Sequence, residues 1–195
     1  MANGHVIIGY SFPHVATYVN TNGTISYTGC IPLARGIRVE IQPSNSDRNV
    51  LRADNADAES SGGRFSGGTA TLVVDGLKSG ARTLIMGTPA AGNDGWIAEG
   101  DTVDPPYVGV GFVVKYREEG VDTYQPVVLA KVKFDTESVK AETEGETVNY
   151  QTQDLTAQIF RDDSASHIWR YRGAEVNTEA AAVSALVTKL GGSAT

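Results

Sequence analysis

Three histidines and a single cysteine are the side chains of this chain best suited to bind a metal ion or to act in nucleophilic catalysis. His5, His14 and His167 never stand at the short spacings of zinc ligands, and Cys30 has no second cysteine. His14 and Cys30 would have to meet in space to form a nucleophile and base pair, and neither lies in a recognisable nucleophile motif. We therefore expect packed or exposed side chains and no metal site.

The glycine-rich and acidic segments do not fit a cofactor or calcium site. Gly109-Val110-Gly111 resembles the start of a dinucleotide fingerprint, but the third glycine is absent and a strand pattern continues where a helix is needed. No segment ends in the Gly-Lys-Ser or Gly-Lys-Thr of a phosphate-binding loop. The stretch from Asp54 to Glu59 is acidic, yet Ala56 and Ala58 stand where an EF-hand requires ligands. We expect no cofactor.

Arginines alternate with aromatic residues in a short segment, Trp169-Arg170-Tyr171-Arg172, as on surfaces that bind nucleic acids. Strand alternation predicts Trp169 and Tyr171 on one face and the arginines on the other, which favours a core-facing aromatic pair with solvated charges. The acidic pairs Glu118-Glu119 and Asp162-Asp163 are better interpreted as turn and edge charges than as catalytic groups. No catalytic constellation emerges from this search.

The composition predicts one globular domain over residues 1–195. The formal net charge of -7 opposes binding to phosphates and suits a surface past which DNA slides. No basic and apolar leader precedes Arg35 and no apolar run reaches the length of a membrane span, so we expect a mature protein that begins near Met1 and has no membrane partner. A lone cysteine fits assembly in a reducing cytoplasm.

Period-two patterns predict a mainly β protein. The clearest is a long antiparallel hairpin of Tyr107 to Arg117 and Tyr124 to Phe134, joined by a turn at 118–122. Its even positions, Val108, Val110, Phe112, Val114, Tyr124, Val128, Ala130, Val132 and Phe134, should face a core. Its odd face carries glycines with Val113, Val127 and Leu129, and we expect a neighbouring subunit to cover it.

Further elements follow from turn signals and periodicity. The segment from Ala16 to Tyr27 is predicted to form a second hairpin, with its turn at Asn22-Gly23. Strands are expected over 38–42 and 69–77, with a long polar excursion from Pro43 to Gly68 between them. Additional expectations are a short helix over 79–86, a break in strand phase near Gln153-Asp154, and a short strand at 167–171.

The chain should end in a helix over 178–190. Thr178 is the expected N-cap, and Gly191-Gly192 follows the last turn. An i, i+3, i+4, i+7 stripe is expected to dock this helix on the sheet, and it consists of Val183, Leu186, Val187 and Leu190.

Two groups of short motifs resemble the major tail tube proteins of siphophages and prophages of Gram-positive bacteria. The first group is Asn49 to Glu59 followed by Phe65 to Leu72. The second is Tyr107 to Arg117, Leu129 to Phe134, Glu142 to Glu146 and Tyr150 to Thr152. Their order and spacing also match, and the resemblance extends over roughly residues 30–172.

The resemblance implies an antiparallel β-sandwich or barrel-like fold with a flanking helix. It further implies hexameric rings that stack into a virion tail tube around the tape measure protein. The tube lies between the tail terminator and the distal tail proteins, and DNA passes through it. The excursion at 43–68 becomes the long loop between rings. Its candidate contact residues are charged: Asp47, Arg48, Arg52, Asp54, Asp57, Glu59 and Arg64.

We expect an acidic lumen, because carboxylates repeated around a ring would repel phosphates. The candidate lumen acids lie in two stretches of the chain: Asp94, Glu99, Asp101 and Asp104 in the first, and Glu142, Glu144 and Glu146 in the second. Lys115, Arg117, Lys131 and Lys133 share the odd face of the central hairpin and would attract DNA unless carboxylates pair with them. Solvated outer loops are the alternative interpretation of the acidic stretches.

Two other classes of protein stay open. A capsid or distal tail protein would share this composition and strand content. A monomeric β-sandwich binding module, for instance one that recognises carbohydrate, would carry exposed aromatic residues on one face. An enzyme ranks third, because the sequence offers no catalytic constellation.

Overall fold

The computed structural model describes residues 4–47, 49–53, 56–89, 91–143 and 150–193. The elements in this part of the chain are, in order, β1 (Val6–Thr21), β2 (Thr24–Pro32), β3 (Gly36–Asn45), β4 (Asn49–Ala53), β5 (Ala56–Ser61), β6 (Phe65–Val74), α1 (Ser79–Met86), β7 (Val108–Glu118), β8 (Val121–Phe134), β9 (Gln153–Phe160), β10 (Arg170–Arg172) and α2 (Glu179–Lys189). The protein is mainly β, with 49% of residues in strands, as the sequence predicts.

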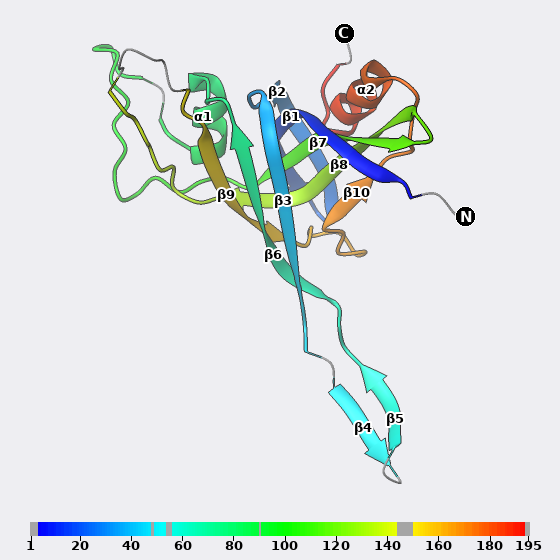
Figure 1. The fold of residues 1–195 in the computed structure, drawn as a ribbon. Helices are drawn as coiled ribbons and strands as arrows, with labels where there is room; N and C mark the ends of the chain where they lie inside the picture. Colours follow the sequence, from blue (N-terminus) through cyan, green and yellow to red (C-terminus); the bar gives the residue numbers. More distant parts are fainter. Residues whose placement is uncertain (1–3, 48, 54–55, 90, 144–149, 194–195) are drawn as a thin grey trace.

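One antiparallel sheet forms the body of the molecule (Figure 1). Its order is β2-β1-β7-β8-β9-β6-β3, and β10 pairs with β8 beside β9. The sheet is not closed into a barrel. A second sheet consists of β4 and β5, which lie far from the body at the end of the long β3–β6 ribbon.

Both predicted hairpins are confirmed. The β1–β2 turn places Asn22 at φ 52° and Gly23 at φ 83°, and the β7–β8 turn places Glu119 at φ 49° and Gly120 at φ 86°. Left-handed pairs of this kind match the twist of the flanking strands. The predicted helix over 79–86 is also confirmed as α1, and β9 begins at Gln153, where the change of strand phase is expected.

The two faces of the β7–β8 hairpin pack against different layers. The face that carries Val110 and Phe112, which we call the core face, packs with β6, β9 and α1 through Leu72, Leu155 and Ile85. The opposite face carries Gly111 and Val113 and is covered by α2, and we call it the helix face. The covering expected from a neighbouring subunit is therefore supplied by the chain's own C-terminal helix.

A β-bulge in β8 overturns the predicted facing of that strand. Val108 pairs with Val132 but Val110 pairs with Leu129, so β8 has one residue more than β7 over this interval. As a result Val127 and Leu129 lie in the core cluster together with Val132 and Phe134, while Val128 lies on the helix face. The prediction that Val113, Val127 and Leu129 share a face is wrong for this reason.

The predicted pairing of Trp169 with Tyr171 on one face is also wrong. Trp169 lies before the first residue of β10, so the alternation of side chains along that strand does not determine its facing. It packs against the core cluster and stacks on Phe65 with ring centroids 4.5 Å apart. Tyr171 packs in the helix-face cluster instead.

Candidate functional site

The β3–β6 ribbon and the β4–β5 hairpin form a projecting arm (Figure 1). The segment expected as a loop at 43–68 is thus largely a β-ribbon, in which β3 pairs with β6 from Gly36 to Asn45. At the base of the distal hairpin the backbone amide of Ser46 donates to the Arg64 carbonyl oxygen at 2.7 Å, and the Gly63 amide donates to the Ser46 carbonyl oxygen at 3.2 Å. These bonds continue the ribbon into the arm's distal part.

The predicted ring-contact residues all belong to this arm where the structure describes them. Asp47 and Arg64 are exposed at the junction of the ribbon with the distal hairpin. In the distal hairpin Arg52 is in register with Asp57, and Glu59 with Leu51. Arg48 and Asp54 lie outside the described residues.

The sheet ends in two strands that have a partner on one side only. Within the described part of the chain β2 pairs with β1 and β3 pairs with β6, and neither has a second strand partner. An unpaired strand edge presents a row of backbone donors and acceptors that another chain can extend. These edges are therefore candidate surfaces for strand pairing between subunits.

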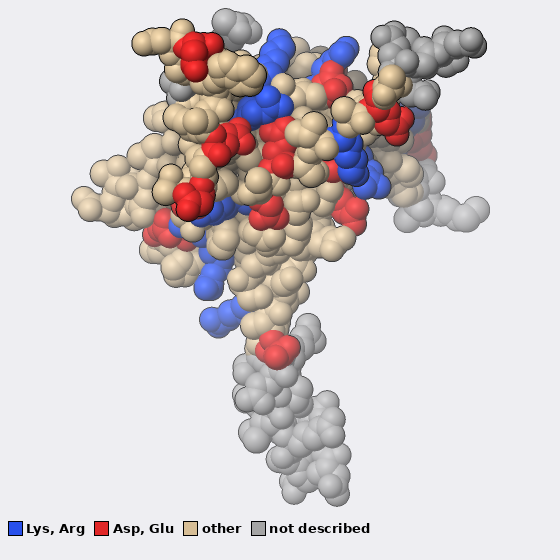
Figure 2. Space-filling model, turned by 90° about the vertical axis from the view of Figure 1, so that its left-hand side faces the viewer, with Lys and Arg blue, Asp and Glu red and all other residues tan. Residues whose placement is uncertain are grey.

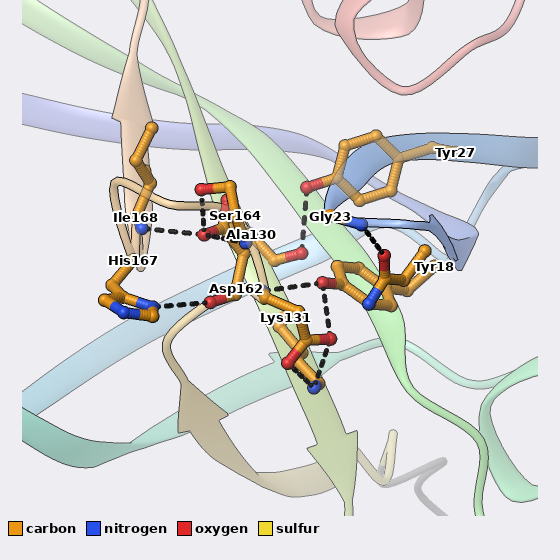
Figure 3. A network of polar contacts seen from close by, with 11 residues as sticks. Tyr18, Gly23, Tyr27, Ala130, Lys131, Asp162, Ser164, His167 and Ile168 are labelled. Atoms are coloured by element: carbon orange, nitrogen blue, oxygen red, sulfur yellow. Dashed lines mark hydrogen bonds and ion pairs between the residues drawn. The ribbon is translucent and has the colours of Figure 1, made fainter.

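A polar network closes the loop between β9 and β10 (Figure 3). Asp162 is buried, with 2% of its surface exposed. Its carboxylate accepts hydrogen bonds from the Ser164 hydroxyl at 2.6 Å, the Ile168 amide at 2.8 Å and the Tyr171 hydroxyl at 3.3 Å. A buried carboxylate with this many donors is satisfied, so it is suited to fix a loop rather than to bind a ligand.

The neighbouring carboxylate, Asp163, ties the same loop to the sheet. Lys131 Nζ lies 2.8 Å from Asp163 Oδ2, and the Tyr18 hydroxyl donates to that oxygen at 2.9 Å. The hydrogen bond from Lys131 holds the pKa of Asp163 below its usual range. Burial raises the pKa of Tyr18 to about 12, so the phenol stays protonated and donates. The acidic pair thus has a structural role in loop and edge geometry.

The four cations on the odd positions of the central hairpin all have carboxylate partners. Lys115 and Arg117 both pair with Asp122, the former at 2.7 Å. Lys131 pairs with Asp163, and Lys133 pairs with Asp104 at 2.6 Å. These neighbouring anions reduce the attraction of this surface for phosphates.

The candidate lumen acids that the structure describes lie in two long loops at one end of the molecule, beside α1 (Figure 1). Asp94, Glu99 and Asp101 are exposed, whereas Asp104 is bound to Lys133. Glu142 is exposed and accepts a hydrogen bond from Gln151, and Glu144 and Glu146 lie outside the described residues. The side view in Figure 2 shows acidic and basic groups interspersed over this part of the surface.

The predicted docking residues of α2 differ in depth. Leu186 and Leu190 are fully buried against β7 and Tyr27, while Val183 and Val187 are partly buried. Ala182, which the stripe omits, is fully buried as well. Thr178 caps the helix by accepting a hydrogen bond from the Ala181 amide at 3.4 Å. The glycines of β7 explain the close approach, because a Cβ at Gly111 would lie 2.4 Å from Leu186 Cδ1.

The histidines and the cysteine occupy separate, local environments. His5 stacks on Tyr116, His14 bonds the Phe12 carbonyl oxygen at 2.9 Å, and His167 lies in the Asp162 loop. Burial raises the pKa of the Cys30 thiol. Among the described residues no three His, Cys, Asp or Glu side chains are grouped to hold a metal ion. No described helix is long and apolar enough to cross a membrane.

Comparison with known proteins gives no family for this chain. No protein-family model matches it, and no curated protein matches it.

Proposed function

We propose that this chain is a structural subunit of the tail tube of a long-tailed, non-contractile bacteriophage. Its copies assemble into hexameric rings, and the rings stack into a tube that surrounds the tape measure protein and later conducts DNA. The tail terminator and distal tail proteins bind the two ends of this tube. The role is structural, without catalysis, and the protein resides in the virion tail after assembly in the host cytoplasm.

The arm is the observation that carries this proposal. The β3–β6 ribbon extends beyond the body and carries a further hairpin, β4–β5, at its end (Figure 1). A projection that extends beyond the body of the subunit favours a role in contacting another molecule. The resemblance of its sequence to tail tube proteins assigns that contact to the next ring.

The open sheet supports assembly within a ring. Joining the outer edges of β2 and β3 on neighbouring copies would satisfy backbone groups and remove both edges at once. A contact between two different edges is head-to-tail, and it closes into a ring when the rotation between copies allows. The carboxylate partners of Lys115, Arg117, Lys131 and Lys133 are consistent with DNA passage without adhesion.

Electron microscopy of the purified protein tests the proposal. We expect six-membered rings and stacked tubes, either spontaneously or after addition of a tail-tip seed. Closed shells would favour the capsid alternative, and single rings that never stack would favour a distal tail protein. Folded monomers at every concentration and salt, even with the seed, would exclude a tail tube subunit.

A further inference from the structure

An apolar slot lies between β1 and β3, where the curled sheet does not close. The two strands approach each other closely at one point, since a Cβ on Gly36 would lie 2.2 Å from the Tyr10 ring. Beside this point is a cavity of about 420 Å³, which is lined by residues of β1, β3, β7 and β10. Its apolar wall includes Ile7, Ile8, Ile37 and Val39. We call this cavity the β1–β3 slot.

The slot exposes an unusual amount of apolar surface. Ile7 is 65% exposed, Ile37 is 53% exposed and Ile8 is 42% exposed. Tyr10 lines the same slot, and its hydroxyl oxygen is buried with no hydrogen-bond partner among the described residues. Exposed aliphatic side chains beside an unsatisfied polar atom are typical of a surface that a partner covers.

The slot is positively charged, which favours a partner that carries carboxylates. Arg38, Arg170 and Arg172 line it, and none of them forms an ion pair within the described part of the chain. Burial and the nearby Arg172 lower the pKa of Arg170, whose guanidinium lies over the Trp169 ring at 4.3 Å. Three unpaired guanidinium groups beside an apolar wall favour an occupant with both apolar and carboxylate groups.

The loop between α1 and β7 presents a segment of that chemistry. Trp96 is 78% exposed and stands on a hydrogen-bonded turn, in which the Gly92 amide donates to the Trp96 carbonyl oxygen at 2.8 Å and the Trp96 amide donates to Asp94 Oδ1 at 3.2 Å. Asp94, Glu99 and Asp101 surround the tryptophan in sequence and are exposed. Glu99 lies near Arg82, whereas Asp94 and Asp101 form no ion pair with a cation among the described residues. An ordered, exposed tryptophan is a typical interface anchor.

The two surfaces lie on different sides of the same molecule. In Figure 1 the loop from α1 to β7 is at the upper left, whereas the start of β1 and β10 are at the right. A subunit therefore cannot insert its own tryptophan turn into its own slot. Complementary patches at separate positions produce a head-to-tail contact between identical chains.

We propose that the β1–β3 slot of one subunit receives the Trp96 turn of a second copy of this chain. Trp96 covers Ile7, Ile8 and Ile37, and the acids beside it face Arg38, Arg170 and Arg172. The position of this slot contact between neighbours within a ring rests on the proposed tail tube function. It assigns Asp94, Glu99 and Asp101 to a subunit contact, in place of the lumen position that the sequence predicts.

Two variants separate the halves of the contact. Trp96→Ala removes the anchor but keeps the slot, and Arg38→Glu with Arg172→Glu reverses the slot's charge but keeps the anchor. Each variant should raise the subunit concentration needed for half-maximal assembly by at least about 30-fold, the effect of losing an interface hot spot. Arg161→Glu with Lys78→Glu is the matched charge control, because both residues are exposed and outside the slot, and it should assemble as the parent chain does.

A mixture of the two variants tests directly whether the slot of one subunit binds the Trp96 turn of another. A Trp96→Ala subunit has an intact slot and an Arg38→Glu, Arg172→Glu subunit has an intact turn, so an equal mixture should form one-to-one complexes by mass photometry and nothing larger. Rings from either variant at parent concentrations, or no complex in the mixture, would overturn the inference. If both variants form normal tubes, the slot contact is excluded and the tail tube proposal stands. If the parent chain forms closed shells and both variants block that assembly, the slot contact stands and the tail tube proposal is excluded. A parent chain that never self-associates overturns both.

Discussion

The Tyr27 hydroxyl in β2 donates a 2.8 Å hydrogen bond to the carbonyl oxygen of Ala130, the residue at the bulge of β8 (Figure 3). A bulge removes a residue from regular pairing, and its backbone groups need other partners. Tyr27 satisfies the carbonyl, while the Ala130 amide donates to the Trp169 carbonyl oxygen at 2.9 Å. The first hairpin and the β9–β10 loop together stabilise the irregularity that sets the facing of β8.

Tyr27→Phe should destabilise the subunit by about 1–3 kcal/mol. The substitution keeps the buried ring but leaves the Ala130 carbonyl without this donor. Urea unfolding followed by circular dichroism measures the change. Tyr150→Phe is the control, because Tyr150 is 91% exposed, and it should shift stability by less than about 0.5 kcal/mol. Equal effects of the two substitutions would contradict a structural role for the bond.

Leu186→Ala should cost roughly 2–5 kcal/mol, because Leu186 is fully buried between α2 and β7. The same unfolding experiment measures it. Ser184→Ala on the exposed side of α2 provides the control and should stay within about 0.5 kcal/mol of the parent chain. A loss that small for Leu186→Ala would mean that α2 is not docked in the isolated subunit.

Gly111→Ala should also weaken the docking of α2, by about 1–3 kcal/mol, because the added Cβ would lie 2.4 Å from Leu186 Cδ1. Combining it with Leu186→Ala removes the clashing atom, so the double variant should lose less stability than the sum of the two single losses. Gly80→Ala in α1 meets no atom within 4 Å and should be neutral or stabilising. Strict additivity of the first pair would argue against direct contact.

Acid should destabilise the subunit partly through Asp163. Its pKa is lowered in the folded state, chiefly by the hydrogen bond from Lys131, so its contribution is present above the unfolded pKa of about 3.9 and is lost as the pH falls through the folded value. Unfolding at pH 7 and pH 3 in low salt measures this loss. Asp163→Asn should show a smaller difference in stability between the two pH values than the parent chain. The idea fails if Asp163→Asn retains the full loss.

Deleting residues 55–63 should leave a folded subunit that forms rings but does not stack them. The deletion removes the distal part of the arm and leaves the sheet that contains the ring edges. Circular dichroism checks folding, and microscopy compares rings with tubes. Tubes of normal length from the deleted chain would refute the proposed contact between rings.

The sequence by itself determined the two hairpins and both helices, because these follow from local information, whereas the strands of the arm at 43–68 were expected as a loop. Asn22-Gly23 and Glu119-Gly120 define their hairpins through positive φ angles, and the alternation in β7 is regular over its whole length. The C-terminal helix was predictable from its cap and its apolar stripe, with Leu186 and Leu190 among the residues that become buried.

Tertiary structure decided which surfaces meet. The bulge at Ala130 reversed the facing of Val127 and Leu129, and no local pattern marks it, because its backbone groups are satisfied by Tyr27 and Trp169 from distant segments. In the same way the glycines of β7 gave no indication that α2 would cover them, and Ile7, Ile37 and Arg172 form one slot only through the curl of the sheet. Alternation tells which residues share a strand face, but packing between distant strands decides what that face contacts.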